Sequence, residues 1–286
     1  PSLRNFLLPY ANMPMPSEGR FLSSRARSNR IVWFVLLFQV VTSIVSQAAT
    51  NRIRTAHSIG WYNTFLTFRL SDKSSIQAEY QWRREEWISN WQQSLLRIGY
   101  HVQLHPRVTA RLGYGWIETF PYGDIPLNGF GKQFTEHRLF QTIVLQDEVK
   151  RLSISQRWML EERWLGRYAS AAATKEEDFD LLGRIRYQVR LQHPISKPGD
   201  GQGYFYLAAY DELFIGFGKN VKENVFDQNR LAGLIGFQSR SSFRVEAGFL
   251  QQLLQLGREV DGKNVFQYNN GVTVNLYYML DLRKRN

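Results

Sequence analysis

The segment LLGRIRYQVRLQHP, residues 181–194, carries a charged or amide side chain at every second position from Arg184 onward. Arg184, Arg186 and Arg190 share one parity, and apolar residues occupy the positions between them. Because successive side chains of a β-strand point to opposite faces, this spacing gathers the guanidinium groups on one face. Such a row can guide anions, as rings of arginine do in anion-selective pores, or it can pair with carboxylates in a structural network.

Arginine and glutamate recur at the polar positions of other segments with the same period of two. The alternation places Arg69, Arg83, Arg111, Arg244 and Glu79 on the same polar face. The strongest lumen-facing candidates are Arg97, Arg157, Glu161, Arg163, Arg184, Arg186, Arg190, Glu212, Arg230 and Glu246. Two alternatives stay open: an interlocked Arg–Glu network that fills a narrow or plugged structural barrel, and an anion-preferring, porin-like pore for small acidic solutes.

An outer-membrane enzyme is a third and weaker alternative. It would need a nucleophile beside a base, or a cluster of metal ligands. The chain has no cysteine and 5 histidines, none of which accompanies a recognisable nucleophile motif. Glu136 and His137 are neighbours in the chain, so a strand would point them to opposite faces. We therefore expect no catalytic residues, no metal site and no cofactor.

The elements that would position the arginines are β-strands separated by turn residues. Many of them exceed the five or six residues that are usual in soluble sheets, and about 9–11 residues suffice to cross a membrane. Because bacterial single-chain barrels have even strand numbers, we expect about 12 strands, with 10 as the alternative. The segments that show this signature are 62–70, 76–83, 91–104, 108–117, 136–147, 152–168, 179–193, 203–217, 226–239, 243–256 and 264–280.

Short and long connections alternate along most of this series. The long ones are REEWISN, FPYGDIPLNGFGKQF, ASAAATKEED and GKNVKENV, and short turns fall near residues 71, 105, 150 and 240. PISKPGDGQ is longer than its place predicts, and GREVDGK is intermediate. Aromatic residues gather at the strand ends on the long-loop side, as in the girdle of a membrane barrel. We expect the long loops outside the cell and the short turns in the periplasm.

Residues 25–48 have the features of a signal peptide. Basic residues at 25, 27 and 30 precede the apolar run 31–45, and small residues follow at Ser46 and Ala48. The run is shorter than the roughly twenty residues of a spanning helix, which disfavours an uncleaved anchor. Residues 1–24 are then an unstructured leader, or they precede the true start. Residues 49–286 would form the barrel.

The composition agrees with these elements. The 286 residues carry a formal net charge of +11, and 14% of them are aromatic. The mean hydropathy is negative, which argues against a bundle of membrane helices but not against a barrel, where only half of each strand is apolar. We predict an all-β fold, a transmembrane antiparallel up-and-down β-barrel in the outer membrane of a Gram-negative bacterium. Its expected partners are outer-membrane lipid and the barrel-assembly machinery, with small anionic solutes in the pore alternative and no nucleic acid.

The chain resembles a known family over roughly Trp61 to the C-terminus. The resemblance rests on WYNTFLTFRLSDKSSIQAEYQWRR, LLRIGYHVQLHPRVTARLGYGW, EHRLFQTIVLQ, LSISQRWMLEERW and DLLGRIRYQVRLQHP. Its best features are Arg157, Glu161 and Arg163, followed by the arginine-alternating strand. In these the chain is similar to Domain of Unknown Function 2490, a family of bacterial outer-membrane barrel proteins. The resemblance implies a fold and a location. It implies no reaction, no ligand and no functional residues.

Overall fold

The computed structural model describes residues 52–196, 203–221 and 224–283. The expected leader (1–24) and signal peptide (25–48) lie outside these residues. Within the described residues, no helix is long and apolar enough to cross a membrane.

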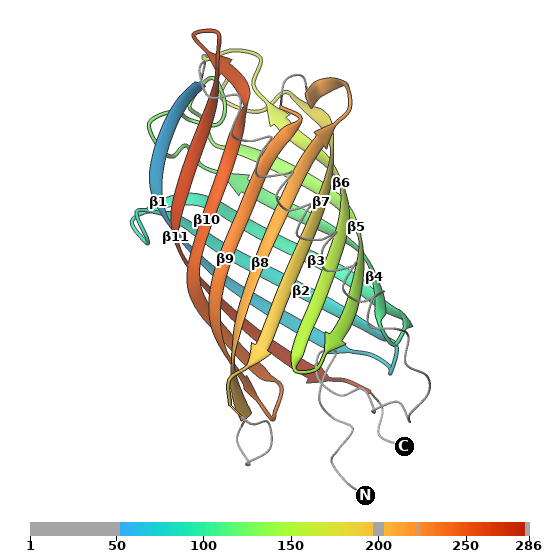
Figure 1. Ribbon diagram of the computed structural model, residues 1–286. Helices are drawn as coiled ribbons and strands as arrows, with labels where there is room; N and C mark the ends of the chain where they lie inside the picture. Colours follow the sequence, from blue (N-terminus) through green and yellow to red (C-terminus); the bar gives the residue numbers. More distant parts are fainter. Residues whose placement is uncertain (1–51, 197–202, 222–223, 284–286) are drawn as a thin grey trace, which may run out of the picture. The chain divides into compact units, whose positions relative to one another are not determined.

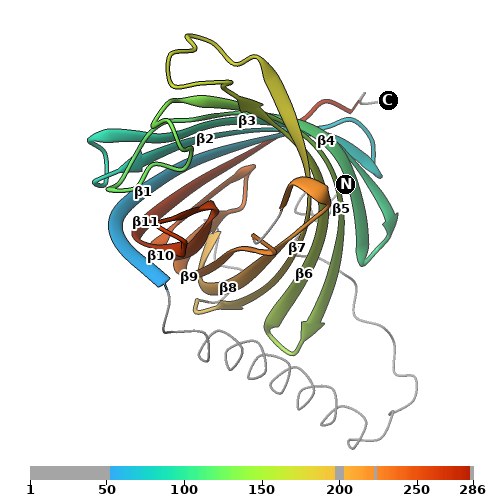
Figure 2. The same ribbon diagram turned by 90° about the horizontal axis from the view of Figure 1, so that it is seen from above.

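The described residues form eleven β-strands that close into one barrel (Figure 1). Seen from above, the strands surround a common interior (Figure 2). In chain order they are β1 (Arg52–Arg69), β2 (Ser74–Glu85), β3 (Asn90–His105), β4 (Val108–Thr119), β5 (Phe134–Val149), β6 (Leu152–Arg167), β7 (Asp178–Pro194), β8 (Gly203–Phe217), β9 (Phe226–Ser239), β10 (Phe243–Val260) and β11 (Lys263–Asp281), with a 3-10 turn η2 (Lys219–Val221) before β9. The all-β barrel expected from the sequence is confirmed.

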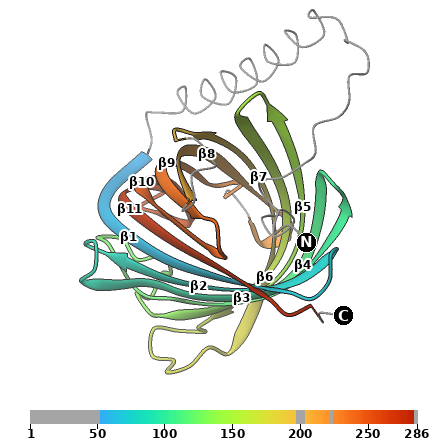
Figure 3. The ribbon, with the colours of Figure 1, turned by 90° about the horizontal axis from the view of Figure 1, so that it is seen from below.

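Consecutive strands pair antiparallel around the barrel, and β1 lies beside β11 (Figure 3). Near the middle of this seam, Asn63 Nδ2 donates to Asn275 Oδ1 at 2.7 Å. Further along both strands, the Leu282 N–H donates to the Arg69 carbonyl at 3.0 Å. Residue numbers therefore rise together on β1 and β11, so these two strands run parallel.

The parallel seam explains the strand count. Each of the eleven segments expected from the sequence overlaps one observed strand. The expectation of about 12 strands, or 10, came from assuming an even number, as an all-antiparallel closure requires. A single parallel pair lets the eleven strands of the described chain close without a twelfth.

Successive connections lie at opposite ends of the barrel, which we call the loop end and the turn end. The loop end carries the connections 86–89, 120–133, 168–177, 218–225 and 261–262. The turn end carries 70–73, 106–107, 150–151, 195–202 and 240–242. The two longest connections, 120–133 and 168–177, lie at the loop end, whereas 218–225 at the loop end and 195–202 at the turn end are equally long. The separation of long from short connections is therefore weaker than expected. REEWISN narrows to a four-residue turn, 86–89, between β2 and β3. GREVDGK is mostly strand, and its Asp261 and Gly262 (φ 52° and 67°) form a two-residue hairpin turn of the type that Asp-Gly favours.

The two faces of the sheet have opposite polarity. Side chains that point into the barrel include Glu161, Glu246 and Arg184, which are 0%, 1% and 3% exposed. Outward positions hold exposed apolar side chains, among them Ile98 at 53% and Phe249 at 56%. Charged residues are rarely buried unless they are paired, so this distribution requires partners for the inward charges.

One wall of the interior is apolar. It consists of Ile59, Trp61, Tyr206, Ala208, Ala232, Leu234 and Leu250, from β1, β8, β9 and β10. The charged residues that follow lie mainly on β5, β6, β7, β8 and β9. The interior of the barrel is thus filled from one side by hydrocarbon and aromatic groups and from the other by ion pairs.

Candidate functional site: the charged interior

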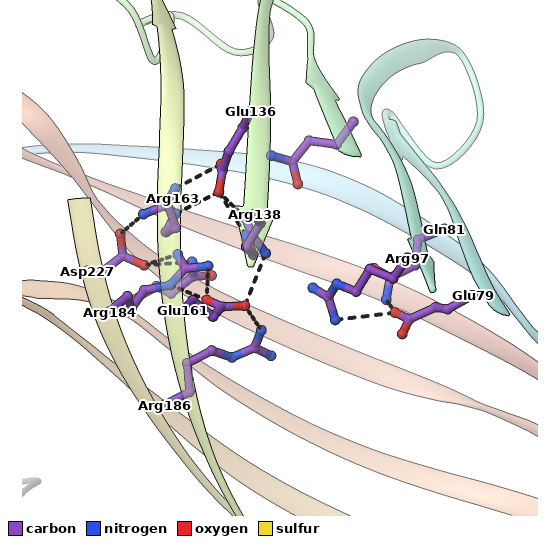
Figure 4. A network of polar contacts seen from close by, with 12 residues as sticks. Glu79, Gln81, Arg97, Glu136, Arg138, Glu161, Arg163, Arg184, Arg186 and Asp227 are labelled. Carbon is purple, nitrogen blue, oxygen red and sulfur yellow. Dashed lines mark hydrogen bonds and ion pairs between the residues drawn. The ribbon is translucent and has the colours of Figure 1, made fainter. Parts of the chain in front are cut away.

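Glu161 of β6 is the centre of the charged wall (Figure 4). The strand register sets it opposite Arg184 of β7, and its carboxylate lies 2.6 Å from Arg184 Nη2. It also accepts from Arg186 Nη1 at 2.8 Å and from Arg138 Nη1 of β5 at 3.3 Å. A carboxylate that is completely removed from solvent is thereby compensated by three guanidinium groups.

The pairs continue into a closed ring of alternating charge (Figure 4). Asp227 of β9 accepts from Arg184 at 2.7 Å and lies 3.6 Å from Arg163. Arg163 in turn contacts Glu136 at 2.7 Å, and Glu136 contacts Arg138 at 2.5 Å. The order around the ring is Glu136, Arg138, Glu161, Arg184, Asp227 and Arg163. Four strands, β5, β6, β7 and β9, are tied together by side chains alone.

A branch extends the ring along β7 and β8. Arg186 lies 2.6 Å from Glu212, and Arg157 lies 2.7 Å from the same carboxylate. We call the ring together with Arg157, Arg186 and Glu212 the charged lattice. Its members contribute charge-assisted hydrogen bonds, which are the strong class.

Two smaller groups stand apart from the lattice. Arg97 of β3 faces Glu79 of β2, with 3.5 Å between the charged atoms. Glu246 of β10 accepts from Arg190 at 2.5 Å and from the Tyr206 hydroxyl at 2.7 Å. Both groups follow the alternation that was visible in the sequence.

Nine of the ten lumen candidates from the sequence therefore lie in ion pairs. These are Arg97, Arg157, Glu161, Arg163, Arg184, Arg186, Arg190, Glu212 and Glu246. The tenth, Arg230, donates from Nε to Gln228 Oε1 at 2.9 Å and lies over the Trp61 and Phe214 rings.

Three lattice members escaped the sequence analysis: Glu136, Arg138 and Asp227. On β5, inward Phe140 and outward Gln141 obscure the alternation. Asp227 follows a register shift near the start of β9, where two adjacent residues are both buried. The signal on β5 was the pair Glu136 and Arg138, which share one parity.

The long connection 120–133, which we call the inward loop, reaches the opposite wall. The Tyr122 hydroxyl donates to Gln267 Oε1 of β11 at 3.1 Å, and burial raises the pKa of this hydroxyl, which keeps it protonated. Gln267 Nε2 donates to the Ile125 carbonyl at 2.9 Å, and Arg258 of β10 donates to the Pro126 carbonyl at 2.8 Å. The loop leaves β4 and returns to β5, so it crosses over the interior at the loop end.

Two histidines have polar side-chain partners. His57 Nδ1 lies 3.8 Å from Glu85, and His137 Nδ1 lies 2.6 Å from the Tyr114 hydroxyl on the outer face. Within the described ranges, no three His, Asp or Glu residues are grouped so that they could hold a metal ion.

The fold and the interior define a class: a closed β-barrel with an apolar outer face and an ion-paired core. The chain belongs to the family described as Protein of unknown function (DUF2490), whose model matches residues 59–262. This agrees with the resemblance seen in the sequence. The comparison with curated proteins gave no match, and neither did the comparison with solved structures.

Proposed function

We propose that this protein is an outer-membrane β-barrel whose interior is closed by its own side chains and its inward loop. The observation that carries the proposal is the reversed polarity of the sheet. Exposed apolar side chains such as Leu112, at 56%, cover the outside, and buried ion pairs occupy the inside. This distribution suits a hydrocarbon surround, where a closed barrel is one of the few folds that satisfy every backbone group.

Closure of the interior is supported by two independent features. The charged lattice joins β5 to β9 through fully or nearly buried groups, and the apolar wall projects from the other side. Above them, Tyr122, Ile125 and Pro126 of the inward loop are hydrogen-bonded to β10 and β11. An ion that crossed the barrel would have to break several of these contacts, so we infer a structural rather than a conducting barrel.

Planar-bilayer recording of the refolded protein tests this proposal. We expect no steady conductance from the wild type. Replacing residues 122–131 with a short glycine-serine linker removes the cover at the loop end. This variant should show current openings more often than the wild type. The matched control is a linker of the same kind in place of residues 170–175, which belong to another connection at the same end. Steady wild-type conductance would contradict closure.

The second candidate function is an anion-preferring pore. An excess of arginine over carboxylate in the interior supports it. Every buried carboxylate has an arginine partner, whereas the buried Arg83 and Arg230 have no carboxylate within 4.0 Å among the described residues. A lumen with surplus guanidinium groups favours anions. The pore predicts an anion/cation permeability ratio above one, which Arg186→Glu should lower while the barrel stays folded.

A further inference from the structure

Two buried arginines at the loop end share one aromatic ring. The guanidinium carbon of Arg83 lies 3.9 Å from the centre of the Trp61 ring, and that of Arg230 lies 4.8 Å from it. The indole is held in place because its Nε1 donates to Gln92 Oε1 at 2.7 Å. Three strands, β1, β2 and β9, thus bring two positive charges together.

The hydrogen-bond partners of both guanidinium groups are neutral. Arg83 donates to the amide oxygens of Gln81 and Gln93. Arg230 donates only from Nε, to Gln228 Oε1, so its two terminal nitrogens have no hydrogen bond within the described part of the chain. Arg230 is 8% exposed, which makes it a buried cation with free donors. Glu212 lies opposite Arg230 in the strand register and offsets part of the cost of its buried charge, but it forms no ion pair with Arg230. Because burial of an incompletely paired charge is costly, an anion at this position would be favoured.

Both arginines line a cavity of about 600 Å³ at the loop end. This volume is within the range of small-molecule sites, about 300–1,000 Å³. The lining also includes the exposed aromatic Phe130 of the inward loop and amides, among them Gln92, Gln252 and Asn128, each of which already hydrogen-bonds to the protein. An amide has two N–H donors and two oxygen lone pairs, so these groups can also bind the hydroxyl groups of a polar ligand. The carboxylates in the lining, Glu136 and Asp227, are paired with arginines of the charged lattice.

We propose that this cavity is a binding site for a small hydroxylated anion, such as a sugar phosphate, with Arg83 and Arg230 holding the acidic group. Guanidinium groups match phosphate and carboxylate geometry, and their stacking on Trp61 keeps them oriented. The amides of the wall then bind the hydroxyl groups. The proposal concerns the cavity alone and holds whether the barrel below it is closed or conducting.

Isothermal titration calorimetry of the full refolded chain in zwitterionic detergent tests the site. Inorganic phosphate and glucose 6-phosphate are the probes, and glucose is the uncharged comparison. We expect glucose 6-phosphate to bind more tightly than phosphate and glucose not to bind. Arg230→Gln and Arg83→Gln should each weaken glucose 6-phosphate binding by about tenfold or more, the usual effect of losing a hydrogen bond to a charged group.

Arg107→Gln is the matched control, because Arg107 is a half-exposed arginine at the turn end and should leave binding unchanged. Arg230→Lys retains the charge and should bind better than Arg230→Gln. The proposal would be overturned if the folded wild type bound neither phosphate nor glucose 6-phosphate. It would also be overturned if both glutamine variants bound glucose 6-phosphate as tightly as the wild type does. If a glutamine variant does not fold, the wild-type titration and the lysine variant still decide. Conductance does not enter these measurements, so their failure is distinct from failure of the closed-barrel proposal.

Discussion

Reversal of the charge at position 186 tests whether the lattice holds the barrel together. Arg186 contacts Glu161 at 2.8 Å and Glu212 at 2.6 Å, and its guanidinium lies 4.3 Å from the Phe214 ring centre. In Arg186→Glu, both carboxylates lose a partner and gain a like charge. Loss of one member of a buried pair costs about 3–5 kcal/mol.

Like-charge repulsion adds to this cost. At a separation of ~4 Å and an effective dielectric constant of ~20, each new pair of carboxylates costs about 4 kcal/mol. Part of this is offset, since Glu161 keeps Arg138 and Arg184 and Glu212 keeps Arg157. We therefore expect the free energy of unfolding to fall by about 5 kcal/mol or more.

Urea unfolding of the protein in lipid vesicles, followed by tryptophan fluorescence, measures this change. Arg107→Glu is the control, because Arg107 and Asp147 form an exposed pair whose loss should cost about 1 kcal/mol or less. If Arg186→Glu unfolds at the same urea concentration as the wild type and changes only ion selectivity, the lattice is not a structural lock and the pore alternative gains.

Three further predictions follow from the seam, the outer face and the connections. Gly271→Ala should prevent stable closure of the barrel, because a Cβ at this position would lie 1.7 Å from the Ile59 carbonyl oxygen of β1. Gly233→Ala should be tolerated, because there is open space around Gly233. The two variants can be compared by the shift in gel mobility between heated and unheated samples. Val189→Arg should impair insertion into vesicles by roughly 2–4 kcal/mol if the outer face contacts lipid, and Val189→Leu should not. Cysteine at Ala172 should be labelled on intact cells and cysteine at Lys150 should not, and the reverse pattern would invert the orientation.

The sequence predicted the parts of the interior that depend on period alone. Arg184 and Arg186 share a parity with Arg190 within one strand, and the same rule found Glu161 and Glu212. The sequence could not predict which carboxylate pairs with which arginine. The pair between Arg184 and Asp227, for example, joins β7 to β9, which are not neighbours in the sheet. Contacts across an interior depend on the closure of the barrel, which no local pattern encodes.

Irregular positions account for the rest. In β5, the apolar Phe140 points inward and the polar Gln141 points outward, which is the reverse of the usual pattern. The alternation that would have assigned Glu136 and Arg138 to the inner face was therefore not recognisable in the sequence. The inward loop was visible as a long connection, but its direction depends on Gln267, more than a hundred residues further along the chain. The expected number of about 12 strands is close to the eleven observed. The difference of one comes from the assumption of an even number, because all eleven segments were found in the sequence.

The parallel seam also sets the order in which the barrel can be built. Ten of the pairings in the described chain join strands that are consecutive in the sequence. The seam joins the two ends of the strand series, and its contact between Asn63 and Asn275 spans 212 residues, so closure comes with the largest loss of chain entropy. Until β11 is in place, β1 and the last strand formed both present open edges. If the barrel forms in a membrane, we expect these edges to need a temporary partner during assembly, and we expect the seam to open first when the barrel unfolds.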